Sequence, residues 1–390
     1  MQFDPRAPEF RADPYPFYEM LRSYAPVFYW ETWGIWFLTR HDDCNALLRD
    51  NRLGHGELFE PPPAQRPLFE MQSRWMLVKN PPDHTRLRSL VHKAFTPRMI
   101  ERLRDTIQDI TDRLLNEVQD KGEMDLIAAL AYPLPVTVIA AMLGVPTADH
   151  DRFHGWSNAL ARSLDLTDDP AVYDRAAAAA VEFTDYMREL VDERRARPQD
   201  DLLSALIAAE EAGDRLTTEE LYATCTLLLT AGHETTINLI GNGTLSLLRH
   251  PDQMQKLKEE PGLIATAVEE LLRYDSPVQL TSRVALADVE IRGQTLRAGQ
   301  QVSFMLGAAN RDPEVFAKPD RLDVGRKPNP HLAFGSGIHY CLGAPLARLE
   351  GQIAIKTLLR RMPGLALAID SPQYNDNYVL RGLAALPMTF

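Results

Sequence analysis

The sequence predicts a mostly helical α+β fold, and three observations support this prediction. Apolar residues recur at helical spacing over long stretches, above all in residues 84–120 and 134–248. Segments with strand character are short, and most of them follow Pro251. No repeat, low-complexity tract or polar linker divides the 390 residues. We therefore expect a single domain over residues 1–390.

Local signals place the elements of the first third of the chain. Residues 27–39 are rich in aromatic and β-branched types, which predicts a hairpin, and a helix is expected from about Asp42. Prolines crowd residues 54–82 and predict a long irregular loop. The helical pattern after this loop is interrupted at Pro97, because proline breaks the hydrogen bonding of a helix interior.

A long central helix has a clear start signal. It should open at Thr217 or Thr218, where Glu220 completes a capping-box pattern, and run toward Arg249. The segments expected after it are a helix near 262–274 and short strands near 282–286, 289–293 and 300–306.

Composition and charge narrow the class of protein. Hydrophobic residues make up 45% of the chain, which is enough to build a core and argues against disorder. The net charge of -12 repels phosphate backbones, so a nucleic-acid partner is not expected. The cysteines, Cys44, Cys225 and Cys341, are scattered and odd in number, which favours a reducing compartment over a disulfide framework. No export signal is visible at the N-terminus, so we expect a cytoplasmic protein.

The longest uncharged stretch covers residues 126–147 and raises the question of a membrane span. Pro133 and Pro135 lie within it, and two prolines this close would break a helix exposed to lipid. We therefore expect two buried segments that meet at a bend, and no membrane span.

Three glycines surround Cys341 in the segment 334–343, ahead of a helical pattern from Ala344 to Leu359. Glycine lets the main chain approach a large group closely, and the N-terminal end of a helix favours thiolate over thiol. The absence of a second nearby cysteine argues against a zinc site or an iron–sulfur cluster. An iron already held by a porphyrin is the coherent partner for this sulfur. The alternative is that Cys341 is only a small core residue.

Residues 231–236, Ala-Gly-His-Glu-Thr-Thr, place polar groups in an otherwise apolar helical stretch. Threonine hydroxyls that bond the carbonyl of residue i−4, next to a glycine, can loosen a helix and leave room for a small ligand. Glu234 and Thr235 would then form an acid–alcohol pair able to relay protons. The alternative is a kink with satisfied polar groups. A zinc-protease HExxH motif starting at His233 is excluded, because position 237 is Ile.

Both segments resemble motifs of the cytochromes P-450. The cysteine segment is similar to the haem-binding signature of that family, with Phe334, His339, Cys341 and Gly343 in place, and residues 231–236 are similar to its oxygen-binding motif. The resemblance covers nearly the whole chain. It implies the cytochrome P-450 fold, a helical bundle around haem with small β-sheets. It also implies Cys341 as the proximal thiolate, Phe334 packed near it, and His339 bonded to a haem propionate.

The resemblance implies roles for further residues. It places Ala231 against the haem and the Glu234–Thr235 pair above it. Glu270 and Arg273, a solvated pair by their i, i+3 spacing alone, match the ExxR motif, which joins an arginine of a later loop, here predicted to be Arg321. The residues that match further propionate contacts are His84, Arg88 and Arg283.

The resemblance implies a haem-thiolate monooxygenase that inserts one oxygen atom from O₂ into a C–H bond of a lipophilic small molecule. Its cofactor would be haem b. Electrons from NAD(P)H would arrive through a separate ferredoxin and its reductase, for which Arg98, Arg102 and Arg348 are candidate contacts. A peroxygenase or an isomerase would not need the intact acid–alcohol pair, and a haem-based gas sensor is the alternative from another class. The sequence does not choose among fatty acids, terpenoids, steroids and polyketides.

Overall fold

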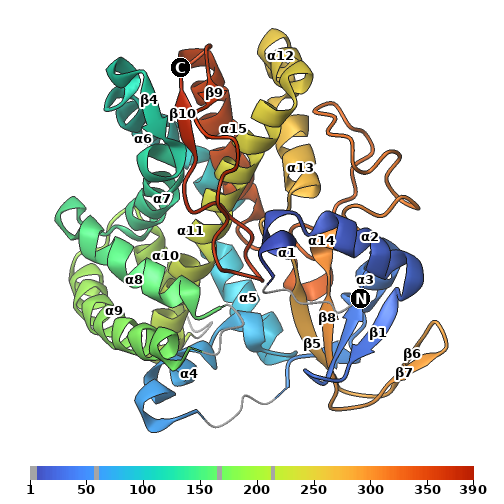
Figure 1. Cartoon of the computed structure of the whole chain (residues 1–390). Coiled ribbons are helices and arrows are strands. Elements are labelled where there is room, and N and C mark those ends of the chain that lie inside the picture. Colours follow the sequence, from blue (N-terminus) through green and yellow to red (C-terminus); the bar gives the residue numbers. More distant parts are fainter. Residues whose placement is uncertain (1–6, 57–60, 165–168, 212–215) are drawn as a thin grey trace. The chain divides into compact units, whose positions relative to one another are not determined.

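The structure is a computed structural model that describes residues 7–56, 61–164, 169–211 and 216–390. Helices predominate and the sheets are small, which confirms the predicted fold class (Figure 1). The chain divides into two compact units, and the single domain expected over its whole length stays a prediction. Unit 1 comprises Met1–Gly56, Thr111–Ala131 and Thr235–Phe390, and unit 2 comprises Glu57–Ile110 and Tyr132–Glu234.

The sheets of the described residues belong to unit 1. The largest has the strand order β1-β2-β8-β5-β3, with β2 and β8 parallel and the other pairs antiparallel. The predicted hairpin is confirmed, with Gly34 at a φ of 65° in its turn. A strand that the sequence did not predict, β7, pairs with β6. The strands are β1 (Val27–Trp30), β2 (Ile35–Leu38), β3 (Leu53–Gly54), β4 (Glu123–Asp125), β5 (Thr281–Ala285), β6 (Val289–Ile291), β7 (Gln294–Leu296), β8 (Gln301–Phe304), β9 (Ala366–Leu367) and β10 (Pro387–Thr389).

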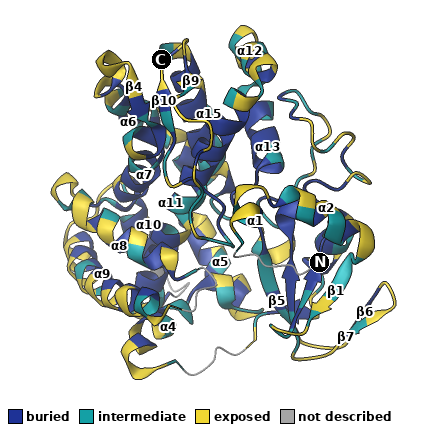
Figure 2. Ribbon diagram, in the orientation of Figure 1, coloured by how far each residue is buried: buried dark blue, intermediate teal, exposed yellow. Residues whose placement is uncertain are grey.

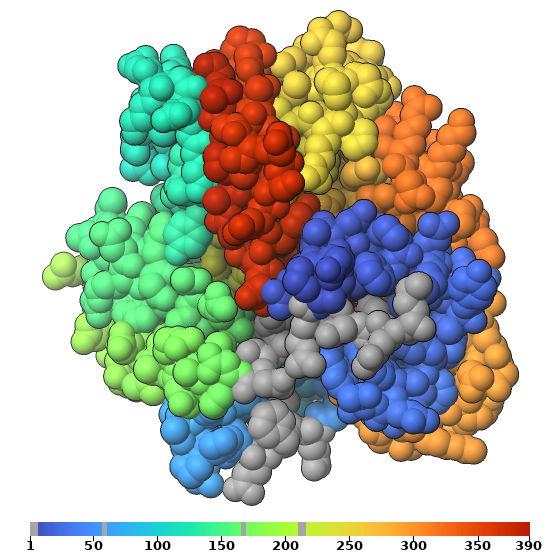
Figure 3. All heavy atoms as spheres, in the orientation of Figure 1, coloured from blue at the N-terminus to red at the C-terminus, as the bar shows by residue number. Residues whose placement is uncertain are grey.

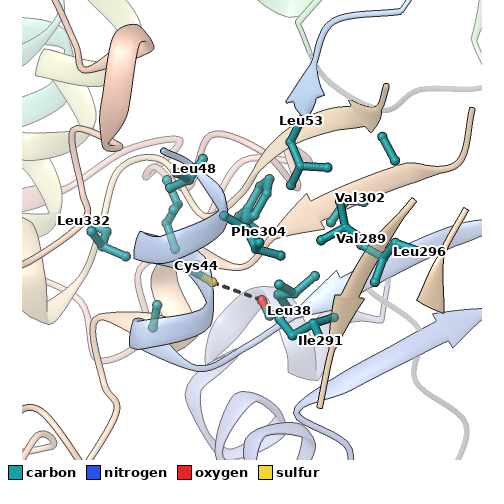
Figure 4. Packing of buried hydrophobic residues seen from close by; sticks show 14 residues of the cluster. Leu38, Cys44, Leu48, Leu53, Val289, Ile291, Leu296, Val302, Phe304 and Leu332 are labelled. Carbon is teal, nitrogen blue, oxygen red and sulfur yellow. Dashed lines mark hydrogen bonds between the residues drawn. The ribbon is translucent and has the colours of Figure 1, made fainter. Parts of the chain in front are cut away.

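A buried apolar cluster packs helix α3 (His41–Leu47) against the main sheet. Figure 4 shows Cys44 of this helix among apolar side chains, including Val302 and Phe304 of β8. Its thiol lies 3.5 Å from the carbonyl oxygen of Leu38, to which it donates a weak hydrogen bond. Burial raises the pKa of Cys44 well above its usual range, so this cysteine acts as a small core residue.

The helical core of unit 1 lies around α13 (Ile264–Tyr274) and α15 (Ala344–Arg361), both largely buried (Figure 2). Gly351 of α15 packs on Leu239, and a methyl group at Gly351 would lie 2.9 Å from the Leu239 side chain. The N-terminal and C-terminal segments also meet in this unit, as the adjoining dark blue and red atoms show (Figure 3), and Arg381 donates a hydrogen bond of 3.0 Å to the carbonyl of Ala12. The other helices of unit 1 are α1 (Pro8–Ala12), α2 (Tyr15–Tyr24), α12 (Pro251–Glu259) and α14 (Leu306–Ala309).

Helices are the only regular secondary structure among the described residues of unit 2. The irregular loop expected at 54–82 is partly wrong, because it contains α4 (Arg66–Gln72), and residues 57–60 lie outside the described residues. This short helix forms because Leu68 and Met71, three positions apart, are both buried on the face toward α9. The helices expected on either side of Pro97 are confirmed. The longer helices, two of which continue into unit 1, are α5 (Asp83–Ala94), α6 (Pro97–Asn116), α7 (Pro133–Leu143), α8 (His150–Arg162), α9 (Pro170–Ala196), α10 (Leu202–Glu211) and α11 (Thr218–Arg249).

The predicted start of α11 is confirmed in detail. The N–H of Thr217 donates to Oε2 of Glu220 at 2.8 Å, and the N–H of Glu220 donates to Oγ1 of Thr217 at 3.1 Å. This reciprocal pair satisfies two backbone donors at the helix end. The two buried segments expected around Pro133 are present, since most residues of the π-helical turn at Ile127–Ala131 and of α7 are buried, and the bend between them stays a prediction. Among the described residues, no helix is long and apolar enough to cross a membrane.

Candidate functional site

Cys341 lies in a loop whose backbone holds its thiol at the surface. Cys44 and Cys225 are buried, whereas Cys341 is exposed. The N–H of Cys341 donates to the carbonyl of Phe334 at 3.0 Å, and α15 begins three residues later, at Ala344. The position at the N-terminus of an 18-residue helix favours the thiolate. The chain therefore presents an accessible cysteine sulfur at the start of a helix, a position that suits a thiolate.

A glycine is required for this loop to fold. Gly337 has a φ of 71°, and a side chain there would overlap the carbonyl oxygen of Leu48. Only glycine tolerates both this positive φ and the close approach of the Leu48 carbonyl oxygen. The loop then makes a short 3₁₀ turn at Gly337–His339, where the His339 ring lies 4.9 Å from that of His55 in an edge-to-face arrangement.

The burial and the hydrogen-bond partners of Arg283 show whether unit 1 could bind a ligand that carries carboxylate groups. It lies on β5 with only 6% of its surface exposed. Its guanidinium donates to Oγ1 of Thr281 at 3.3 Å and to the carbonyl of Ser282 at 2.7 Å. Among the described residues no carboxylate pairs with it, and burial lowers its pKa to about 10. A buried cation in this state fits a ligand that brings its own anion, as a haem propionate would.

Unit 2 holds two further residues that are predicted to contact a propionate, His84 and Arg88. His84 and Arg88 lie four positions apart on α5, so they share one face of that helix as predicted. His84 is buried and Arg88 is half-buried, alongside the apolar residues Leu87 and Val91. Their part in binding a propionate stays a prediction.

The polar segment in the middle of α11 has one face that is accessible to solvent, although most central residues of this helix are buried. Ala231 is exposed and Glu234 and Thr235 are half-buried, while His233 and Thr236 between and beside them are buried. The three accessible residues follow each other at i, i+3 and i+4, so they share one face. This face combines a carboxyl group, a hydroxyl group and a small apolar residue.

Two neighbours in this segment have packing roles. Gly232 lets α11 approach α7, since a methyl group there would lie 2.7 Å from Cδ1 of Ile139. His233, to which the sequence assigned no role, has its Nδ1 atom 2.8 Å from Oγ of Ser157 on α8. Burial lowers the pKa of His233 to about 4, so the ring is neutral. Nothing in the sequence pattern indicated this contact, because Ser157 lies 76 positions away.

The predicted charge framework is present with one correction. Glu270 and Arg273 are fully buried and joined by two hydrogen bonds of 2.7 and 2.9 Å. They are therefore not the solvated pair that spacing alone suggests. The predicted third member, Arg321, is wrong: it is exposed, and Nε of Arg326 instead lies 3.0 Å from both carboxylate oxygens of Glu270. The chain turns back after Arg321, with the N–H of Asp323 donating to Glu270, and this turn brings Arg326 to the carboxylate.

Comparisons with known proteins show the family to which the chain belongs. A family model described as cytochrome P450 matches residues 35–363. The chain is 43% identical to the polyketide biosynthesis cytochrome P450 PksS of Bacillus subtilis, over 100% of this chain and 98% of the relative. It is 45% identical to the biotin biosynthesis cytochrome P450 of the same organism, over 98% and 97%. A crystal structure of P450BioI in complex with an acyl carrier protein superposes with a TM-score of 0.94 at 44% identity, covering 98% of this chain and 99% of that one.

The fold and the family match define a haem-thiolate protein, and the chain belongs to the cytochrome P450 family. It is a monooxygenase that incorporates oxygen from O₂ into a lipophilic molecule, with haem b as cofactor and electrons derived from NAD(P)H through a redox partner.

Proposed function

We propose that Cys341 binds the haem iron as its axial thiolate. The observation that carries this proposal is the exposed thiol of Cys341 at the start of α15, in a loop whose shape depends on Gly337. Cys44 and Cys225 are buried, and burial raises the pKa of each thiol. When bound, the haem supplies the activation of O₂, and a thiolate ligand assists cleavage of the O–O bond. Phe334 and Gly343 would line the thiolate side of the haem.

Four residues would hold the haem propionates: Arg283, His339, His84 and Arg88. Arg283 supports this best, because it is a buried cation without a carboxylate partner among the described residues. A guanidinium can grip a carboxylate with two parallel hydrogen bonds. The Glu270, Arg273 and Arg326 network would stabilise the fold around the haem without touching the substrate.

The accessible face of α11 would serve proton delivery. Glu234 would take up a proton from solvent, and the hydroxyl of Thr235 would receive it and pass it toward the oxygen-binding side of the haem. Ala231 would leave room there for oxygen and substrate, since it has no side chain beyond Cβ. The support is the shared exposure of these three residues in the middle of a helix whose central residues are mostly buried.

The substrate would be a long-chain acyl or polyketide-like molecule, with electrons from a ferredoxin and its reductase. Two solved relatives support this class: P450BioI is in complex with an acyl carrier protein ligated with hexadec-9Z-enoic acid, and a myxobacterial cytochrome P450 is in complex with myristic acid. Both are 44% identical to this chain, whereas CYP109E1, solved with testosterone and with corticosterone, is 35% identical. PksS is named for polyketide biosynthesis.

Two measurements test this proposal. Fatty acids, polyketides and steroids are titrated into the haem-loaded protein, and displacement of the iron-bound water is followed as a shift of the Soret band. Long-chain acyl compounds should give the tightest response, and a response to steroids alone would overturn the substrate class. NADH-coupled product formation with a surrogate ferredoxin and its reductase tests the proposed electron donor: turnover is expected, and its absence in the haem-loaded protein would count against a ferredoxin partner.

A further inference from the structure

Glu269 stands next to Glu270 on α13 and has a different set of partners. Oε1 of Glu269 accepts from Nε of Arg348 at 2.7 Å, and Oε2 accepts from Nη2 at 2.8 Å. Oε2 also lies 3.0 Å from Nε2 of His331. This carboxylate therefore holds one residue that precedes Cys341 by ten positions and one that follows it by seven.

The two partners of Glu269 enclose the ring of Phe334. The guanidinium of Arg348 lies 4.5 Å from the centre of that ring, and the ring of His331 lies 6.0 Å from it. Nη1 of Arg348 also donates to the hydroxyl of Tyr340 at 3.1 Å. Phe334 supplies the carbonyl that accepts the N–H of Cys341, and Tyr340 is the residue directly before Cys341. The contacts of Glu269 thus reach both ends of the Cys341 loop.

The protonation of this cluster follows from its hydrogen bonds. Nδ1 of His331 accepts the N–H of Ala333 at 3.2 Å, so the ring proton lies on Nε2 and points to Glu269. Burial raises the pKa of Glu269, but the hydrogen bonds from His331 and Arg348 outweigh it and lower the pKa to about 2. Glu269 is therefore an anion at neutral pH, and it balances the charge of Arg348.

We propose that Glu269 is a positioning residue for the Cys341 thiolate. Through Arg348 and His331 it fixes Phe334, whose carbonyl orients the backbone of Cys341, and it neutralises the guanidinium beside the thiolate loop. The inference rests on the proposed role of Cys341 as haem ligand. It also changes the expectation for Arg348, whose charge is committed to Glu269 and is not available to a ferredoxin.

Loss of the carboxylate should affect the haem in two ways. The uncompensated cation of Arg348 would stabilise the reduced state and shift the midpoint potential of the haem to a more positive value. The looser loop would increase the share of the reduced carbon monoxide adduct that lacks the long-wavelength absorbance of thiolate ligation. A purely structural salt bridge would change neither quantity in the folded, haem-loaded protein.

The test compares Glu269→Gln with two matched variants. Glu269→Asp keeps the charge and should retain the midpoint potential. Glu101→Gln removes an exposed carboxylate that pairs with Arg104 at i, i+3 on α6, and should change neither readout. The double variant Glu269→Gln with Arg348→Gln removes the unbalanced cation. Its potential should return toward the wild-type value while its carbon monoxide spectrum stays altered.

The outcomes are distinguishable from failure of the proposed function. If Cys341 is not the ligand, the wild-type protein itself lacks the long-wavelength adduct. If the wild type shows the adduct and Glu269→Gln matches Glu101→Gln in both potential and spectrum, the positioning role is overturned. Should Glu269→Gln not fold with haem, the comparison is made with Glu269→Asp and Arg348→Lys. Arg348→Lys keeps the positive charge but removes the planar guanidinium that donates two hydrogen bonds to Glu269. An unaltered carbon monoxide spectrum in Arg348→Lys would then overturn the role.

Discussion

The two consecutive glutamates of α13 build two networks of opposite character. Glu270 has no exposed surface and is paired with Arg273 and Arg326, whereas Glu269 has 28% of its side chain exposed and is paired with Arg348 and His331. Removing one partner of a fully buried ion pair leaves an uncompensated charge, but water and salt screen a half-exposed pair. The first network should therefore determine stability, and the second should determine the geometry and charge of the thiolate loop.

The largest effect should follow from removing the buried carboxylate. Glu270→Ala strands the guanidinium of Arg273 and should lower the free energy of unfolding by about 3–5 kcal/mol. Glu269→Ala should lower it by about 1 kcal/mol or less. Denaturant unfolding of both variants measures the contrast, and equal losses would end the distinction between the two networks.

The corrected partner of Glu270 gives the next largest contrast. Arg326→Ala removes charge-assisted hydrogen bonds to a buried carboxylate and should cost about 1.5–3 kcal/mol of unfolding free energy. Arg321→Ala changes an exposed side chain and should stay within about 0.5 kcal/mol of the wild type. Thermal or denaturant unfolding decides between them. A larger loss for Arg321→Ala would restore the original prediction from the sequence.

Glu350 on α15 extends the comparison to a buried acid without an ion pair. Its Oε2 atom has no hydrogen-bond partner among the described residues, and burial raises its pKa from 4.5 to about 8. Between pH 4.5 and about pH 8, Glu350 of the folded chain retains a proton that the unfolded chain has released. Stability should therefore fall as the pH rises through this window, by up to about 1.4 kcal/mol per pH unit.

Glu350→Gln tests this sign directly, because it keeps the shape of the side chain and cannot titrate. Unfolding free energies measured from pH 5 to pH 8 should show a flatter profile for Glu350→Gln than for the wild type. Parallel profiles would mean that Glu350 does not carry the pH dependence.

The smallest effect is expected at the exposed start of α11. Thr217→Ala removes one side of the capping box and should cost about 1 kcal/mol, since the N–H of Glu220 then loses its acceptor. Thr218→Ala, one position into the helix, is the matched control and should have little effect. Circular dichroism during thermal unfolding measures both, and equal shifts would contradict the capping role.

Sequence reasoning succeeded where the determining contacts are local. The capping box of α11 and the break at Pro97 depend on residues within one or two helical turns, and both are confirmed. Helix α4 was not predicted, because the prolines in and before this seven-residue segment indicate a loop. The segment becomes helical by packing against α9. The strand β7 has the same length as β6, which the sequence predicted, but two of its three residues are polar and it forms by pairing with β6.

The same difference between local and long-range contacts applies to the candidate site. The loop around Cys341 has a local signature, so its glycines and its helix could be predicted. The family resemblance predicted Arg321, and nothing in the sequence near Arg326 indicates that the turn directs this residue to Glu270, 56 positions away. The network of Glu269 was missed for the same reason, since its partners lie 62 and 79 positions along the chain.

The absorbance spectrum of the reduced carbon monoxide adduct tests the bond between the sulfur of Cys341 and a haem iron, on which the other proposals depend. The haem-loaded protein is reduced, exposed to carbon monoxide and compared with Cys341→Ser and with Cys44→Ala, which alters a buried cysteine of the core. We expect long-wavelength absorbance from thiolate ligation in the wild type and in Cys44→Ala, and its loss in Cys341→Ser. A wild type without that absorbance, or a Cys341→Ser variant that retains it, would rule out Cys341 as the haem ligand.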